Sequence, residues 1–187
     1  MRAAEVVFAD KGFDAASMRN VAVEADVGLP LVVYHFETKL NLYRAIFEQH
    51  QHLNESRVEA LRAIDIAAPD ALEAAVAAFL RISSLATDER IANYLSIVLR
   101  EAADPHAYDR NILPELFDPM AREFIEAFEQ ILPGKPAGFH RWAYLFAVGA
   151  YISTNVGARG DRIGGEGAAS TRVEYLHSFI CAGIRHG

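Results

Sequence analysis

The sequence predicts an all-α protein of about nine helices, and three observations lead to that fold class. Apolar residues recur at intervals of three and four along most of the 187 residues, whereas the alternation typical of strands is nearly absent. The composition, with 52% hydrophobic residues, 12 glycines and 7 prolines, is that of a folded chain and not of a disordered or collagen-like one. A chain of this length buries a sizeable core.

Caps and breakers separate the expected helices. These helices span residues 2–10, 18–25, 29–35, 39–63, 71–86, 88–103, one or two over 107–132, 138–157 and 170–185. Gly12 is expected to end the first helix, and Ser17 and Thr38 to cap the second and fourth. Pro30 is tolerable in the third because it falls in the first turn.

The later boundaries rest on the same kinds of signal. Asp70, with Glu73 three residues later, indicates a helix start, and Thr87-Asp88 opens the next helix. Prolines mark further breaks or kinks at positions 105, 114, 119, 133 and 136. The pattern predicts a three-helix domain over residues 1–38 and a larger helical domain over 39–187, with the helix 39–63 connecting the two.

The helices expected at 18–25 and 29–35 form a helix-turn-helix pattern, in which the second helix reads the DNA major groove. Val21 and Ala22 provide a small apolar face that lets the two helices cross closely. Asp26 occupies the corner between them, where we expect a positive φ angle, which Asp tolerates better than most residues other than glycine.

An ordered set of residues surrounds this pattern. Its members are Phe8, Lys11-Gly12-Phe13, Val21-Ala22, Ala25, Val27, Tyr34-His35-Phe36, Lys39 and Leu42. Through this set, residues 3–48 resemble the N-terminal domain of the TetR family of bacterial transcriptional repressors. The resemblance implies a homodimer whose two third helices enter successive major grooves of a pseudo-palindromic operator. It also implies a ligand pocket in the C-terminal domain, where a small-molecule effector changes the spacing of those helices.

The sequence departs from the family in the corner and in the reading helix. Relatives usually have Gly where this chain has Asp26 and Ser where it has Gly28, and many carry Lys, Arg or Thr within positions 29–33. We therefore expect Leu29 and Val33 to pack on thymine methyl groups. A more permissive operator is expected, because each missing bidentate base contact forgoes about 1–3 kcal/mol of discrimination. Relatives also have several residues, often basic, ahead of the first expected helix, so either an upstream start or a lost arm is expected.

Phosphate contacts fix the register of such a domain without base-reading side chains. The candidate DNA-binding residues are Ser17, Arg19, Asn20, Gly28, Leu29, Pro30, Val33, Tyr34, His35 and Lys39. The net charge is −7, and the first fifty residues carry five Lys or Arg against seven Asp or Glu. This balance argues against a basic coat for unspecific binding, so DNA contact depends on where the few cations lie.

The C-terminal domain offers candidates for a ligand pocket and a dimer interface. The pocket candidates are Tyr94, Arg100, Phe124, Phe128, Trp142, Phe146, Tyr151 and Asn155, and the interface candidates are Gly149, Ser153, Tyr175, Phe179 and Ala182. Any one aromatic residue is more often core packing than a ligand contact. The last two helices are apolar on more than one face, which favours burial against a second copy of the chain.

Other functions find little support in the sequence. The single cysteine, Cys181, lies among apolar residues and predicts a small buried side chain in a cytoplasmic protein, and no apolar run is long enough to span a membrane. His50 and His52 lack metal-ligand spacing and are expected to be solvated. No catalytic arrangement, metal or cofactor is predicted. The alternatives are a ligand-binding or interaction protein of the same architecture that has lost specific DNA binding and, third, an enzyme built in a helical bundle.

Overall fold

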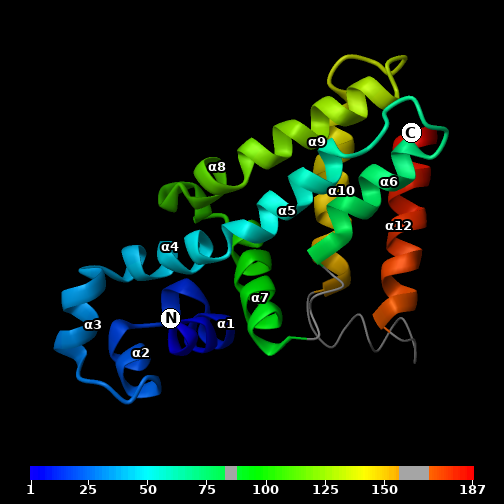
Figure 1. Cartoon of the computed structure of the whole chain (residues 1–187). Helices are drawn as coiled ribbons and strands as arrows, with labels where there is room; N and C mark the ends of the chain where they lie inside the picture. Colours follow the sequence, from blue (N-terminus) through cyan, green and yellow to red (C-terminus); the bar gives the residue numbers. More distant parts are fainter. Residues whose placement is uncertain (83–87, 156–168) are drawn as a thin grey trace. The chain divides into compact units, whose positions relative to one another are not determined.

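The computed structural model describes residues 1–82, 88–155 and 169–187, and all regular structure within these ranges is helical (Figure 1). The elements are α1 (Arg2–Ala15), α2 (Met18–Glu24), α3 (Leu29–Phe36), α4 (Lys39–Gln49), α5 (Gln51–Arg62), α6 (Ala71–Leu80), α7 (Glu89–Ala103), the 3-10 helix η2 (Ala107–Arg110), α8 (Ile112–Leu116), α9 (Asp118–Ile131), α10 (Phe139–Asn155) and α12 (Ala169–His186). The predicted all-α class is confirmed.

Two of the stretches expected to be helical, 39–63 and 107–132, are each divided in the structure. The helix predicted over 39–63 breaks at His50, whose backbone leaves the helical region (φ −101°, ψ 10°) where its side chain enters the core. The stretch 107–132 breaks at Asn111, which has a left-handed φ of 54°, and again at Phe117. The end predicted for the helix 71–86 lies partly outside the described residues, as does the end of 138–157.

The chain packs as two units, each described by itself. Unit 1 comprises Met1–His52 and Ala86–Phe117, and unit 2 comprises Leu53–Leu85 and Asp118–Gly187. The two units are defined by which residues contact one another. The predicted boundary at residue 38 instead separates a DNA-binding domain from a ligand-binding and dimerisation domain, and it stays a prediction.

In unit 1, α1 packs against α7, α2 and α4, and α3 packs against α2 and α4. Four aromatic rings form the centre of this core. Tyr43 lies between Phe8, Phe13 and Phe47, with ring centroids 4.8, 4.9 and 5.1 Å away respectively. Gly12 interrupts α1 with a φ of 73°, which favours glycine, and the helix resumes beyond it to Ala15.

A buried carboxylate in α1 holds three elements of unit 1 together. Glu5 is 0% exposed and accepts hydrogen bonds from Arg90 of α7 (3.1 and 3.2 Å) and from Gln49 of α4 (3.3 Å). The Nε2 atom of His50 lies 2.9 Å from Glu5 Oε1, and the His50 ring stacks on Tyr94 at 4.2 Å. The expectation that His50 is solvated is wrong, because its partner comes from 45 positions earlier in the chain.

A second buried carboxylate, Glu101, lies near the end of α7. It accepts hydrogen bonds from the Tyr43 hydroxyl (3.1 Å) and from Arg110 Nε (3.1 and 3.0 Å). Arg110 also pairs with Asp104, and its guanidinium lies 4.8 Å from the centre of the Phe13 ring. Burial and the neighbouring Glu101 charge raise the pKa of Tyr43, so it stays protonated. α1, α4 and η2 are thereby joined to α7 by buried polar contacts as well as apolar ones.

Unit 2 is a helical bundle in which α6 contacts α9 and α12, and α10 contacts α9 and α12. The rings of Phe124 and Tyr144 each lie 5.8 Å from that of Phe79, and the Tyr151 ring lies 6.2 Å from it. Arg57 of α5 is 8% exposed, and its guanidinium lies over the rings of Phe79 and Phe124 at 5.0 and 5.8 Å. A buried cation within an aromatic core is the unusual feature of this unit.

Candidate functional site

The corner between α2 and α3 has the geometry of a helix-turn-helix. Asp26 has a φ of 52°, which confirms the positive value expected for it. The Val27 amide donates to the Ala22 carbonyl at 3.0 Å and closes the turn. Val21, Ala22 and Val32 are buried, and their small side chains allow the two helices to approach each other closely. In Figure 1, α2 lies beside both α1 and α3.

Ser17 and Asn20 form a reciprocal cap at the start of α2. The Ser17 amide donates to Asn20 Oδ1 (3.0 Å), and the Asn20 amide donates to Ser17 Oγ (3.1 Å). The Ser17 hydroxyl also donates to Asn20 Oδ1 at 2.7 Å. The expected cap at Ser17 is confirmed. The side-chain oxygen of Asn20 is therefore occupied within the cap, although both residues are DNA-binding candidates from the sequence.

Lys39, the first residue of α4, has its ammonium group turned toward the end of α1. Its Nζ atom donates to the carbonyls of Phe13 (2.8 Å), Asp14 (3.3 Å) and Ala16 (3.2 Å), and lies 4.3 Å from the centre of the Phe13 ring. An ammonium has three N–H donors, so these carbonyls account for all of them. This geometry differs from the outward, phosphate-binding Lys39 expected from the sequence, because the carbonyls left unpaired at a helix end attract a cation.

The outer face of α3 is apolar and exposed. Tyr34 is 81% exposed and Val33 is 42% exposed, and Pro30 and His35 are also exposed. Leu29 is half-buried on the inner stripe that it shares with Val32 and Phe36. Gly28 precedes the helix as its N-cap and, lacking a side chain, provides no capping oxygen. Of the predicted base-reading pair, Val33 points outward, and Leu29 does not.

Cations are scarce around this face. Within residues 12–38 the sequence holds one Lys or Arg, Arg19, which is exposed. Four acidic residues lie in the same stretch, at positions 14, 24, 26 and 37. Arg19 is therefore the strongest candidate of this segment for a phosphate or a guanine.

The residues predicted for the ligand pocket are distributed over both units. In unit 1, Tyr94 is buried on the His50 ring, and exposed Arg100 donates to the Asp10 carbonyl at 3.3 Å. In unit 2, Phe124 and Phe128 are buried, and Tyr151 is half-buried. Trp142 and Phe146 are 61% and 69% exposed, and the side chain of Asn155 lies outside the described residues.

Within unit 2, the structure brings together Phe124, Tyr151, Phe79 and Arg57. The last two were missed from the sequence. Arg57 lies in a polar stretch of α5 that resembles a solvated helix face, and the sequence carries no signal that this one cation is buried.

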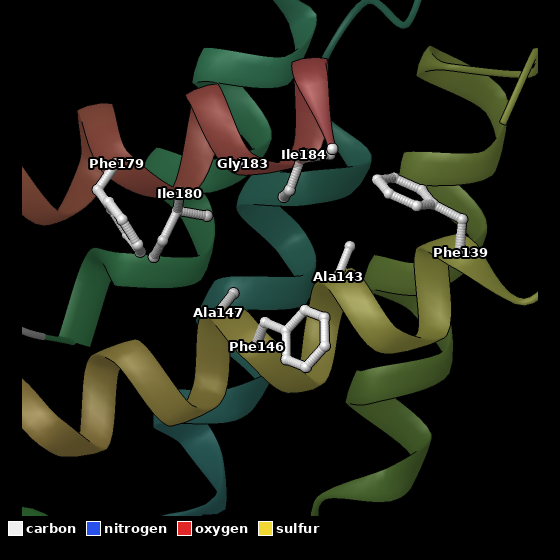
Figure 2. A pocket seen from close by; sticks show the side chains of 9 residues that line it. Phe139, Ala143, Phe146, Ala147, Phe179, Ile180, Gly183 and Ile184 are labelled. Atoms are coloured by element: carbon white, nitrogen blue, oxygen red, sulfur yellow. The ribbon is translucent and has the colours of Figure 1, made fainter.

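Exposed aromatic side chains lie on the outer face of α10 and α12 in unit 2. Phe146 and Phe179 are both 69% exposed, and Tyr175 is 73% exposed. A groove of about 390 Å³ runs between the two helices. Figure 2 shows its lining, which consists of Phe139, Ala143, Phe146, Ala147, Phe179, Ile180, Gly183, Ile184 and Gly187. All five residues predicted for a dimer interface, Gly149, Ser153, Tyr175, Phe179 and Ala182, are exposed in the single chain.

Within residues 1–82, 88–155 and 169–187, no helix combines the length and the apolar character that crossing a bilayer requires. Among the same residues, no group of three or more His, Cys, Asp or Glu side chains is placed to hold a metal ion.

A helix-turn-helix with an exposed second helix, followed in the chain by a helical bundle, defines a DNA-binding protein of the transcription-regulator class. The sequence profile described as "Bacterial regulatory proteins, tetR family" matches residues 1–46. The profile described as "Tetracyclin repressor-like, C-terminal domain" matches residues 73–183. The chain belongs to the TetR family of transcriptional regulators.

Individual relatives agree with this assignment. The HTH-type transcriptional activator FasR of Mycolicibacterium smegmatis is 44% identical over 48 residues, which are 26% of this chain and 22% of that protein. The match thus spans about a fifth of the length of this relative. The regulator PfmR of Thermus thermophilus has the same fold with a TM-score of 0.67 at 16% identity, over 99% of this chain and 98% of that one. NalD of Pseudomonas aeruginosa, a secondary repressor of the MexAB-OprM multidrug efflux pump, has a TM-score of 0.63 at 22% identity, over 97% and 92%.

Proposed function

We propose that this regulator is a dimeric repressor that binds a pseudo-palindromic operator through α3 of each copy and leaves it when a small molecule binds unit 2. The observation that carries the proposal is the exposed outer face of α3 on a turn closed by Asp26 and Val27. In this proposal, residues 1–38 bind DNA in the bacterial cytoplasm, and residues 39–187 bind the effector and the second copy. NalD is named a repressor and FasR an activator, so the sign of regulation belongs to the proposal.

The apolar face of α10 and α12 supports dimerisation. Trp142, Phe146 and Gly149 follow one another at helical spacing on α10, as do Tyr175 and Phe179 on α12. Exposed aromatic side chains in a contiguous stripe are unfavourable in water and typical of a surface that a partner covers. A second copy of the same chain covers such a face symmetrically, with α10 and α12 of each copy forming a four-helix interface.

The aromatic cluster of unit 2 supports an effector site there. Phe79, Phe124, Tyr144 and Tyr151 provide rings, and Arg57 provides a positive charge beside them. Mostly apolar walls with one oriented charged group are typical of small-molecule sites. Binding that favours one conformation of the dimer lowers operator affinity by the same coupling free energy.

Gel retardation with the DNA upstream of the protein's own gene tests the proposal. Retardation should weaken steeply with salt, because phosphate contacts release counterions. A ligand found by displacement of the fluorescent probe 1-anilinonaphthalene-8-sulfonate should reduce retardation. A protein that retards neither this DNA nor any sequence selected from a random library would contradict the proposal.

Light scattering after size exclusion tests the dimer separately. Phe179→Glu places a charge in the proposed interface and should give a monomer. Tyr108→Glu is the matched control, since Tyr108 is 84% exposed and lies in unit 1. It should leave the dimer intact. A Phe179→Glu protein that elutes as a dimer at the same concentration contradicts the assigned interface.

A second candidate function is favoured by the occupied ammonium of Lys39 and by the scarcity of cations within residues 12–38, where Arg19 is the one Lys or Arg. It is a ligand-binding protein of the same architecture that no longer binds DNA specifically. Ligand binding without retardation of any DNA would support this candidate.

A further inference from the structure

Apart from the Tyr34 hydroxyl and the ring of exposed His35, the outer face of α3 offers a DNA base no side-chain group that donates or accepts a hydrogen bond. Pro30, Val33 and Tyr34 share this face, because they are separated by three and four positions on a helix. Val33 is 42% exposed and Tyr34 is 81% exposed, whereas Val32 on the opposite stripe is 7% exposed. The face is a local apolar surface on the helix that this family directs at DNA.

Two of the polar DNA-binding candidates are engaged within the protein. Asn20 Oδ1 accepts from the amide and the hydroxyl of Ser17. The Lys39 ammonium donates to three carbonyls. The sequence between residues 12 and 38 then provides Arg19 as its one Lys or Arg. Hydrogen-bond readout, which distinguishes bases through bidentate Arg, Asn or Gln contacts, is therefore confined to few positions.

The major-groove edges of the four base pairs carry one apolar group, the C5 methyl of thymine. We infer that Pro30 and Val33, flanked by Tyr34, recognise the methyl groups of thymines in each operator half-site. This inference rests on the proposed operator binding and adds the chemical class of the bases that are read. The pair differs from the one expected from the sequence, because Pro30 is exposed whereas Leu29 is half-buried.

The spacing of the two side chains fits neighbouring bases. Residues three positions apart on an α-helix are separated by about 4.5 Å along its axis. Successive bases on one strand are separated by about 3.4 Å. Each copy of α3 therefore reaches two adjacent base pairs, and the dimer reads four methyl groups.

Replacement of thymine by deoxyuridine tests this inference, because it removes the methyl group and keeps every hydrogen-bonding group of the base pair. High-affinity duplexes are first selected from a random DNA library with the unmodified full chain. One selected duplex is then synthesised with thymine, with deoxyuridine in both half-sites, or with deoxyuridine only in the flanks. The dissociation constants are measured by fluorescence anisotropy at one salt concentration.

Deoxyuridine in the half-sites should weaken binding substantially. Burial of one methyl is worth about fourfold in an equilibrium constant, so four methyls predict a loss of up to about 250-fold. Deoxyuridine in the flanks should change affinity by less than about twofold, because no methyl is lost from the predicted contacts. Selected duplexes should also contain adjacent A·T pairs in each half-site.

A double-mutant cycle assigns the effect to α3. Val33→Ala shortens an exposed side chain and should reduce the ratio of thymine to deoxyuridine affinity by about 16-fold, because one methyl contact per copy is lost. Val23→Ala is the control, since Val23 is 76% exposed on α2 and lies outside the proposed face. It should leave the ratio unchanged. Circular dichroism verifies that both variants are folded.

The outcomes separate the inference from the function on which it rests. If no sequence is enriched from the library, operator binding itself fails and the inference fails with it. If a selected duplex binds equally well, within about threefold, with deoxyuridine in its half-sites, operator binding stands and methyl recognition by α3 is overturned. If Val23→Ala lowers the ratio as much as Val33→Ala, the assignment to Pro30 and Val33 is overturned.

Discussion

Replacement of Glu5 by Gln should destabilise unit 1 strongly, although the side chain keeps its shape. Glu5 is fully buried and accepts two hydrogen bonds from the half-exposed Arg90, and it lies 2.9 Å from His50 Nε2. Charge-assisted hydrogen bonds contribute about 1.5–3 kcal/mol each, and screening of the half-exposed guanidinium reduces the sum, so we expect a loss of about 2–3 kcal/mol. That corresponds to a decrease in Tm of about 5–10 °C for a chain of this size.

The effect should depend on pH with a defined sign. Burial by itself raises the pKa of Glu5, but hydrogen bonds from Arg90 and His50 outweigh burial and hold the pKa below 4.5. A depressed carboxyl pKa stabilises the folded state above the unfolded value, and this stabilisation disappears as the pH falls through the folded value. The difference between the wild-type protein and Glu5→Gln should therefore be full at pH 7 and vanish in strong acid.

Urea unfolding followed by circular dichroism measures both effects, at one protein concentration because the proposed dimer would make stability concentration-dependent. Glu89→Gln is the matched control. Glu89 lies at the start of α7 and pairs with Arg2 at 3.7 Å, with both side chains about three-quarters exposed, so its loss should have little effect. Equal stability of Glu5→Gln and wild-type at pH 7, or a difference that does not become smaller as the pH falls through the acidic range, would refute the reasoning.

Three further measurements check other parts of the structure. Lys39→Met should leave the slope of log Kd against log salt unchanged, because the Lys39 ammonium is bound to carbonyls. Arg19→Gln should reduce this slope by about 2 for the proposed dimer. The opposite pattern would make Lys39 the phosphate contact. Tyr43→Phe should lower the free energy of unfolding by about 1 kcal/mol through loss of the bond to Glu101, and an unchanged urea midpoint would contradict that contact. Burial raises the pKa of Cys181 to about 11, so a thiol reagent at pH 8 should label Cys181 only after the protein unfolds. Rapid labelling of the native protein would contradict the burial of this thiol.

The local features of the helix-turn-helix were determined by the sequence alone. The caps at Ser17 and Thr38 and the positive φ of Asp26 depend on atoms within about four positions of each residue. Such interactions are encoded by residue type and spacing, because the helix fixes where the partner lies. The family resemblance over residues 3–48 rests on the same local order, and the profile match to residues 1–46 confirms it.

The partners of the charged side chains were decided only by the tertiary structure. Lys39 binds carbonyls 23 to 26 positions earlier, and His50 meets a carboxylate 45 positions earlier. Arg57 is buried against rings of α6 and α9. Helical periodicity places a residue on a face, but it does not say which face another helix covers. For α10 the consequence is large, since Trp142 and Phe146 look like core residues in the sequence and lie exposed in the folded chain.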